Sequence, residues 1–556
     1  MICYLFVVTT FVFKNTKQSY GVNDDVIIQN WLSGFYTGTP ELMIRGSATP
    51  RISFGFVVSN LYRFVPNINW FSIILLGLTL LSWYLLGNLA IRSRNYLVII
   101  VYLLVSSLHL LWFIPSPTYT ASAVILSFST MIYLLKKISD NEINKIFIVI
   151  SIAYVVGFMI RPESFLLGTA ATFPFIVFTL VKNKSTIRKK IKLILTSIFL
   201  IITILGIDIA FEKNYYKSNS DWVEYKEWES ARYKIQANSP EKVVAENPAR
   251  YGWTEAEVEI FKNYNSIDSK FFTTNKLNQL ISETKNTSEI NLEFLYKAHQ
   301  QIFDSDVNWE WKNLIQLISL IYLFFLLLSL PKFINFFLLS STSLLIIYVI
   351  MLYVAGFLRQ PERVQVSVII LAILVSWTSF IFSKKNDSMI QFNQFITLSL
   401  VLLTLIASVT INQISYLKLK TEGAAPHSFW VDEMLFLSKF PDDSVFVGNA
   451  SQFRNNWSSP YKIRNYEVEN RIFTFGWHNF SPHWTKRAEN LGLDSKNILK
   501  SIIQDSRVYW VSDPESMEYI VNYMKERNYK FIGPIIVGKM DYVGNEYKVW
   551  NFDPSE

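Results

Sequence analysis

The chain has 556 residues, of which 51% are hydrophobic, 16% are aromatic and only 17% are charged. Soluble domains carry roughly 25% charged residues, so this composition argues against a soluble, disordered or nucleic-acid-binding protein. The net charge of +8, from 52 basic and 44 acidic residues, is interpreted as the loop charge of a membrane protein. The one cysteine, Cys3, excludes an internal disulfide and a cysteine-based metal cluster.

The first apolar stretch, residues 1–13, is short for a membrane span and lacks the basic segment that opens a signal peptide. We interpret it as a first transmembrane helix and regard the true start of the chain as open. A bilayer core of about 30 Å takes about 20 helical residues to cross, and further stretches of about that length bring the predicted total to about eleven. They cover residues 70–91, 95–114, 119–138, 144–160, 164–182, 192–211, 313–330, 333–357, 364–383 and 395–412.

The charge of the short loops predicts the orientation of these spans. Alternate short loops are rich in lysine and arginine, whereas the loops at 115–118, 161–163 and 358–363 hold only three arginines. By the positive-inside rule the basic set is cytoplasmic, which places the N-terminus inside and the C-terminus outside. The basic set comprises Arg92, Arg94, Lys136, Lys137, Lys145, Lys182, Lys184, Arg188, Lys189, Lys190, Lys192, Lys332, Lys384 and Lys385.

The predicted fold is therefore an α-helical polytopic membrane protein. Residues 1–412 form the transmembrane domain, with long outer loops at 14–69 and 212–312, and residues 413–556 form a small extracytoplasmic α/β domain. We expect the protein in a bacterial cell membrane, among lipids and without a nucleic-acid partner.

Local patterns predict elements in the outer segments. A capping box, Thr254 with Glu257, opens a helix in the 212–312 loop. Short runs of β-branched and aromatic residues in the tail indicate strands, and a helical pattern lies between them. The predicted helices are 274–284, 289–303 and 516–527, and the predicted strands are 445–447, 508–511 and 547–552.

Two adjacent carboxylates, Asp24 and Asp25, follow the first helix and lie near the outer membrane face. They are the candidate catalytic residues, because a carboxylate there can accept a proton from a hydroxyl nucleophile. The pair can also hold a divalent cation, Mg or Mn, with oxygen ligands. The other interpretation is that Asn23 or Asp24 caps a short helix that ends near Gly34. The two interpretations are compatible, since a capping segment also positions its carboxylates.

Two short outer loops carry arginine beside glutamate, Arg161 with Glu163 and Arg359 with Glu362 and Arg363. The arginines are candidates for clamping a lipid phosphate, because the guanidinium fork fits phosphate oxygens. The glutamates would then hold the arginines in place. Anchoring to lipid headgroups explains these loops equally well, since an ion at the membrane edge has a low cost.

Other ionisable residues have weaker assignments. Three arginines in the first outer segment could join the phosphate clamp: Arg45, Arg51 and Arg63. Asp208 near the outer end of its helix could face the cavity or make an interhelical hydrogen bond. His109 is interpreted as a packed polar contact, and His478 and His483 lie in an aromatic stretch that suits either sugar stacking or a domain core. The histidines show no spaced metal-ligand pattern.

These features together resemble the GT-C superfamily of membrane glycosyltransferases. The segment Asn23-Asp24-Asp25 occupies the place of that superfamily's acidic loop motif, and the topology with an outer C-terminal domain matches its architecture. The stretch from Trp31 to Pro40 is also similar to bacterial members associated with surface-polysaccharide synthesis.

The resemblance implies transfer of a sugar from a polyprenyl-phosphate-linked donor to a cell-surface glycan or a lipid-linked acceptor, on the outer face and with inversion at the anomeric carbon. Asp24 would be the general base, and Asp25 would assist it by hydrogen bonding or metal contact. Basic residues at the outer surface bind the lipid phosphate in such enzymes, and Arg161, Arg359 and Arg363 are the best placed here.

Three alternatives remain at this point. An outer-face polysaccharide polymerase also has many spans and a large outer loop. A transporter or flippase of lipid-linked glycan predicts ionisable residues at mid-membrane depth and internal repeats, and the sequence offers essentially only His109 and no repeat. The third alternative is a non-catalytic scaffold of a cell-wall assembly complex.

Overall fold

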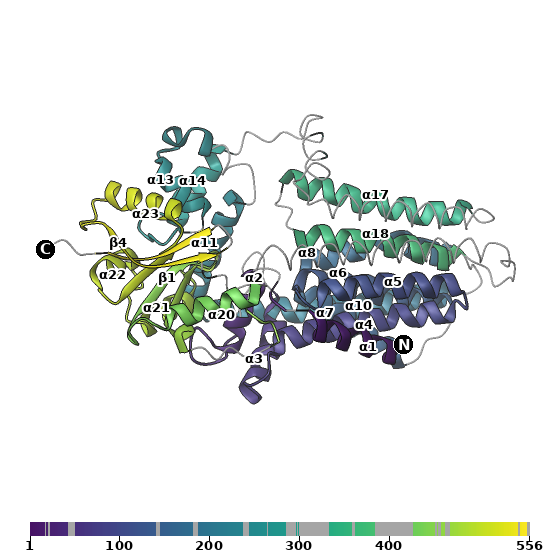
Figure 1. The fold of residues 1–556 in the computed structure, drawn as a ribbon. Helices are drawn as coiled ribbons and strands as arrows, with labels where there is room; N and C mark the ends of the chain where they lie inside the picture. The colour runs from purple at the N-terminus through teal and green to yellow at the C-terminus, as the bar shows by residue number, and fades with distance from the viewer. Residues whose placement is uncertain are drawn as a thin grey trace.

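In the computed structural model a bundle of long helices forms one end of the molecule, and a five-stranded sheet with shorter helices forms the other (Figure 1). The N-terminus lies in the bundle and the C-terminus beyond the sheet (Figure 1). The structure describes residues 1–16, 18–20, 23–42, 50–140, 145–181, 187–236, 244–263, 265–284, 296, 299, 333–357, 362–383, 426–450, 453, 458–461, 467–542 and 545–552.

Within these residues four helices are long and apolar enough to cross a membrane. A further pair of helices, bent by 40° at the break between them, makes a fifth span if the two cross together. The four are α4 (Trp70–Arg92), α6 (Tyr119–Ser139), α17 (Phe333–Phe357) and α18 (Glu362–Ser383), and the bent pair is α8 (Pro162–Ala171) with α9 (Phe173–Val181).

The predicted number of about eleven spans is not supported by this count of four or five. Three predicted spans form shorter apolar helices, α1 (Ile2–Asn15), α5 (Tyr96–Phe113) and α7 (Lys145–Ile160). At 1.5 Å per residue the 14 residues of α1 extend only about 21 Å, less than the bilayer core. The predicted spans at 313–330 and 395–412 lie outside the described residues.

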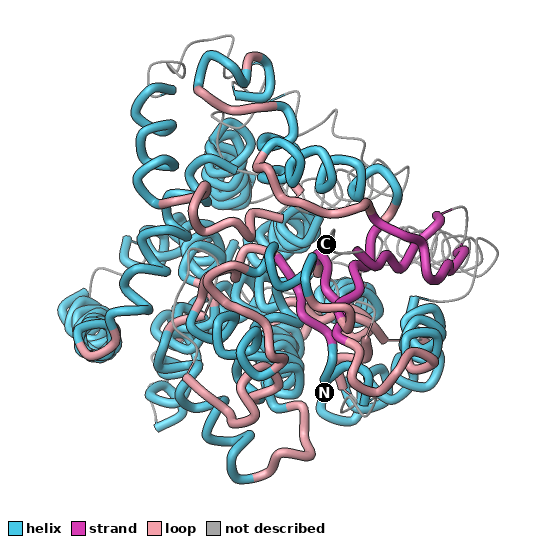
Figure 2. Tube along the Cα trace, turned by 90° about the vertical axis from the view of Figure 1, so that its left-hand side faces the viewer, coloured by secondary structure: helices cyan, strands magenta, loops and turns pink. Residues whose placement is uncertain are grey.

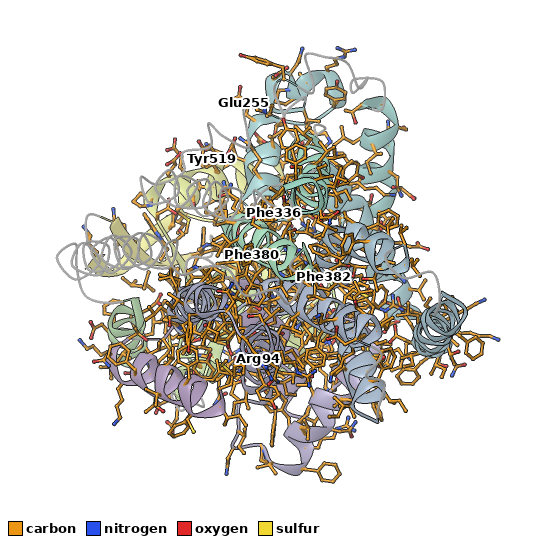
Figure 3. The ribbon with its side chains drawn as sticks, turned by 90° about the vertical axis from the view of Figure 1, so that its right-hand side faces the viewer. Arg94, Glu255, Phe336, Phe380, Phe382 and Tyr519 are labelled. Carbon is orange, nitrogen blue, oxygen red and sulfur yellow. The ribbon has the colours of Figure 1, made fainter. Side chains whose placement is uncertain are left out.

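Large aromatic side chains fill the interior of the bundle. Phe336 of α17 and Phe380 and Phe382 of α18 are buried there, and Figure 3 shows them between the helices. The hydroxyl of Tyr4 in α1 donates to the carbonyl oxygen of Leu103 in α5, at 2.8 Å. Side-chain packing and interhelical hydrogen bonds of this kind hold helices together where water is absent.

Shorter helices surround the junction between the bundle and the sheet, except for α13 (Glu255–Lys262) and α14 (Thr274–Thr284), which lie beside α23 (Pro514–Glu526) near the C-terminal end of the chain (Figure 1). The capping box predicted at Thr254 and Glu257 is confirmed, with both of its hydrogen bonds present. The predicted helix at 274–284 is confirmed as well, whereas 289–303 lies almost wholly outside the described residues. The other helices of this group are α2 (Asn23–Ser33), α3 (Ile52–Phe64), the C-terminal part of α10 (the whole helix is Ile187–Lys217) and α11 (Ser220–Gln236).

The C-terminal region, defined here as residues 426–552, contains the sheet (Figure 2). The strand order is β2-β1-β3-β5-β4, in which β1 is parallel to β2 and β3, and β5 is antiparallel to β3 and β4. The three predicted strands and the predicted helix 516–527 are confirmed, whereas β2 and β4 were not predicted. The elements are α20 (Pro426–Leu437), β1 (Val445–Asn449), β2 (Ile472–Phe475), α21 (Pro482–Asn490), α22 (Ile498–Gln504), β3 (Val508–Ser512), α23 (Pro514–Glu526), β4 (Pro534–Tyr542) and β5 (Asn545–Phe552).

One hydrophobic core joins α2 to the C-terminal region. It includes Ile28 and Trp31 of α2, Trp222 of α11, and Trp484 and Trp510 of the C-terminal region. Burial of such large side chains stabilises a fold by roughly 1.5–3 kcal/mol each. The helix that carries the acidic pair is therefore packed against segments that lie more than 400 residues away in the chain.

Candidate functional site

The acidic pair occupies the first turn of α2, at the junction between the bundle and the C-terminal region (Figure 1). The helix ends as predicted, before Gly34, which has the left-handed backbone conformation (φ 80°). The Asp24 side chain is 23% exposed, whereas Asp25 is fully buried. The two neighbouring carboxylates therefore lie in different environments, and Asp24 is the one that a substrate can reach.

Arg363 pairs with Asp24 across 339 positions of the chain. Its Nη2 donates to Asp24 Oδ2 at 2.7 Å, and the guanidinium is 13% exposed. Arg363 lies in the first turn of α18, directly at the end of the bundle. Its Nε is buried and has no hydrogen-bond partner among the described residues. The guanidinium therefore has a donor left for a further acceptor.

Asp25 contacts the first residue of α6. Its Oδ1 accepts the backbone N–H of Tyr119 at 3.1 Å, and its Oδ2 has no hydrogen-bond partner within the described part of the chain. Burial raises the pKa of the Asp25 carboxyl to about 7, against the lowering effects of Arg363 and of the Tyr119 N–H. Asp25 is therefore partly protonated near neutral pH.

Arg161 is the second cation of this site and lies at the N-cap of α8. Its Nη1 donates to Thr120 Oγ1 at 2.5 Å, and its guanidinium carbon lies 4.8 Å from the centre of the Tyr119 ring. Among the described residues Arg161 forms no ion pair. Its charge acts on two neighbours, because it lowers the pKa of Asp25 and opposes the rise in the pKa of Tyr233 of α11.

The site therefore brings together four of the predicted residues, Asp24, Asp25, Arg161 and Arg363. They come from the first turns or N-caps of three helices, α2, α8 and α18, and α6 adds Tyr119 and Thr120 at its own start. Two cations and two carboxylates meet where the bundle ends, and their hydrogen-bonding capacity is only partly used.

The remaining predicted residues lie away from this cluster or outside the residues that the structure describes. Glu163 is exposed in the first turn of α8. Outside the described residues lie Arg45, Arg359 and the side chain of Glu362. His109 is packed as predicted, since its Nδ1 accepts the indole N–H of Trp83 at 3.0 Å.

Arg51 belongs to a different ion-pair cluster. Its Nε donates to Asp208, and its Nη2 pairs with Glu212 at 2.7 Å. Ser53 donates to Asp208 from both its hydroxyl and its backbone N–H. Of the two sequence interpretations of Asp208, the structure shows the interhelical contact. Arg51 already has two carboxylate partners, and it does not contact the acidic pair.

The sequence did not single out Tyr119, Thr120 or Tyr233. A signal for the first two was present, because the loop at 115–118, which the charge pattern predicts on the same side as 161–163 and 358–363, precedes its predicted span just as they precede theirs. Residues that begin spans on one side of a bundle lie at one level. No comparable signal existed for Tyr233, whose approach depends on how α11 packs.

Among the described residues, no group of three or more histidine, cysteine, aspartate or glutamate side chains is arranged to hold a metal ion. Comparison of the chain with protein-family models, with curated proteins and with solved structures finds no match.

Proposed function

We propose that this protein is an inverting membrane glycosyltransferase of the GT-C type, which uses a polyprenyl-phosphate-linked sugar as donor on the outer face of a bacterial cell membrane. The acceptor is a cell-surface glycan or a lipid-linked saccharide. The observation that carries the proposal is a cluster of charges at one end of an apolar helix bundle. Asp24 forms an ion pair with Arg363 there, and the positive charge of Arg161 lowers the pKa of Asp25.

The proposed orientation follows from the loop charges and from the place of the site. Helix α2 lies at the bundle end that faces the C-terminal region (Figure 1), and Arg363 and Tyr119 contact its acidic pair there, with Arg161 close enough to act on Asp25. The basic loops 92–94 and 136–145 follow α4 and α6 at the other end of the bundle, away from the acidic pair. Arg94 lies at this end, which faces the viewer in Figure 3. With positive loops inside, the site and the C-terminal region are extracytoplasmic and the N-terminus is cytoplasmic. About eleven spans remain part of this proposal.

A lipid-linked donor suits a site of this kind. Its prenyl tail stays in the bilayer, and its phosphate lies at the interface, at the level of Arg161 and Arg363. Guanidinium groups bind phosphate oxygens through paired hydrogen bonds. Arg161 lacks an ion-pair partner among the described residues, and Arg363 has a free Nε there, so both have capacity for an anion.

The chemistry then divides among the residues of the cluster. Asp24 takes the proton of the acceptor hydroxyl, whose oxygen attacks the anomeric carbon from the face opposite the phosphate. The bond between that carbon and the phosphate oxygen breaks, and the lipid phosphate leaves with the electron pair. Arg161 and Arg363 stabilise the negative charge that develops on it. Binding of the phosphate draws Arg363 from Asp24, which frees the carboxylate to act as the base.

Asp25 has a positioning role in this scheme. Its bond to the Tyr119 N–H fixes the start of α6 beside α2, and its burial keeps it from the acceptor. If the reaction uses a divalent cation, Asp24 and Asp25 are its candidate ligands.

The test is the glycan composition of cells that carry Asp24→Asn at a normal protein level. The matched control is Asp221→Asn, because Asp221 is also an acid in the first turn of a helix but is exposed on α11. We expect loss of one sugar from the glycan in the first variant only. An unchanged glycan in Asp24→Asn cells contradicts the proposal. Shorter chains of unchanged composition also contradict it, and indicate a polymerase.

A further inference from the structure

The acidic helix α2 is enclosed along almost its whole length. Every residue from Asp25 to Leu32 is buried, including the polar side chains of Gln29 and Asn30. A helix of 11 residues has little stability of its own. The position of Asp24 therefore depends on what surrounds α2.

The segments before and after α2 both contact the C-terminal region. Before the helix, the backbone N–H of Tyr20 donates to the carbonyl oxygen of Ser458 at 3.3 Å. After the helix, Glu41 lies 3.1 Å from Nε2 of His483 and forms an ion pair with Lys486 at 2.8 Å. The hydrogen bond from His483 lowers the pKa of Glu41 to about 2, so Glu41 is charged at neutral pH. The C-terminal region thus holds the chain on both sides of the acidic pair.

Trp31 is the central contact between α2 and these segments. It is fully buried, and its ring stacks on His483 with a centroid distance of 5.2 Å and an interplanar angle of 16°. Edge contacts join it to Trp477 at 5.2 Å and to Trp222 of α11 at 6.1 Å. Aromatic pairs of this kind contribute roughly 0.5–1.5 kcal/mol each beyond their buried area.

Trp31 and Asp24 share one face of α2. They are seven residues apart, which corresponds to about two helical turns and about 10 Å along the axis. A rotation of α2 about its axis would carry Asp24 away from Arg363 and would break the stacking of Trp31 on His483 at the same time. The aromatic contact therefore defines the rotation of the helix.

We propose that the C-terminal region positions the reacting carboxylate, and that Trp31 is the positioning residue through which it does so. This inference rests on the proposed function in taking Asp24 as the reacting group. It assigns to residues 426–552 the task of holding α2 in register with the cations of the bundle.

The test compares Trp31→Leu with Trp510→Leu in the full chain, in lipid nanodiscs. Trp510 is equally buried, but it packs in the core of the C-terminal region against Phe475 and Phe552 and is therefore the matched control. Hydrogen–deuterium exchange of the peptide that covers α2 is the first readout. We expect Trp31→Leu to raise exchange in α2 about tenfold, and Trp510→Leu to raise it only in the sheet.

Transfer kinetics are the second readout. We expect Trp31→Leu to lower kcat at least tenfold with KM for the lipid-linked donor nearly unchanged, because Arg161 and Arg363 lie on other helices. Trp31→Phe, which retains an aromatic ring, should restore most of kcat. Unchanged exchange in α2, or an equal rise in the Trp510→Leu variant, overturns the positioning role. If neither Asp24→Asn nor Trp31→Leu alters transfer while α2 exchange rises as expected, the glycosyltransferase assignment fails and the structural coupling stands.

Discussion

The molecule has two clusters of guanidinium and carboxylate groups, and they differ in how completely their carboxylates are partnered. Arg51 forms ion pairs with Asp208 and Glu212, and both oxygens of Asp208 accept hydrogen bonds from Arg51 or Ser53, although Arg51 Nη2 itself donates no hydrogen bond among the described residues. In the second cluster, Asp25 Oδ2 and Arg363 Nε are buried without a partner among the described residues. Buried polar groups are ordinarily satisfied. The first cluster therefore fits a structural role, and the second has the unused capacity that a ligand site needs.

The largest expected effect concerns the Arg51 cluster. Removing one member of a buried ion pair leaves an uncompensated charge and costs about 3–5 kcal/mol. We expect Arg51→Gln to lower the free energy of unfolding by about that amount, measured by thermal denaturation in detergent. Asp208→Asn together with Arg51→Gln should recover part of the loss. A variant Arg51→Gln of normal stability but without transfer would instead place Arg51 in the phosphate clamp.

The second effect concerns Arg363. We expect Arg363→Gln to lower the rate of transfer about 10²–10³-fold, the loss typical of one charge-stabilising donor. Its effect on the free energy of unfolding should be smaller than that of Arg51→Gln, because its partner Asp24 is 23% exposed whereas Asp208 is 1% exposed. Steady-state transfer kinetics and thermal denaturation of the same preparation measure the effect on the rate and the effect on stability separately. A loss of stability as large as that of Arg51→Gln would make Arg363 a structural residue.

A smaller effect is expected for Arg161. Lysine keeps the charge of arginine but loses the paired donor geometry, so Arg161→Lys should raise KM for the lipid-linked donor about tenfold with little change in kcat. The matched control is Arg63→Lys, whose guanidinium is exposed and donates to the carbonyl oxygen of Pro40. Equal kinetics in both variants would remove Arg161 from the donor site.

The smallest effect concerns pH. The pKa of Asp25 is raised to about 7 from an ordinary 3.8, so its burial favours the protonated form. Its contribution to stability is fully present below about pH 4 and is lost as the pH rises to about 7. Asp25→Asn removes this dependence. We therefore expect the variant to gain stability relative to the wild type between pH 5 and pH 8, by a few degrees in Tm. A constant difference across this range would contradict the protonation of Asp25.

Local patterns predicted the elements that depend on nearby residues. The capping box at Thr254 and Glu257 and the helix over 274–284 were readable because each depends on contacts within one or two turns. Strand β4 was not predicted, because it lies at the edge of the sheet and is paired on one side only, with β5. Its apolar residues Ile535, Ile536 and Val537 are exposed in succession and show no alternation.

The number of spans was harder to predict, because apolar composition does not determine helix length. The predicted span at 164–182 is divided at Thr172 into α8 and α9, and the predicted span at 144–160 is the short helix α7. Prediction by apolar runs treats each run as one straight helix of sufficient length. A bend therefore escapes it, and so does a run such as 144–160, whose helix matches the run but is shorter than a membrane span.

The candidate site shows the same division between local and long-range information. The sequence alone determined that acids and arginines lie at the ends of apolar runs, because residue type and loop position are local properties. It favoured Arg363 over Arg51 as a phosphate ligand, but it could not identify the partner of either arginine, since both lie in segments that are only predicted to be outer. Only the tertiary structure decided that Arg51 meets Asp208 and that Arg363 meets Asp24. Pairing across 339 residues depends on how the helices pack against one another, and no local pattern records that packing.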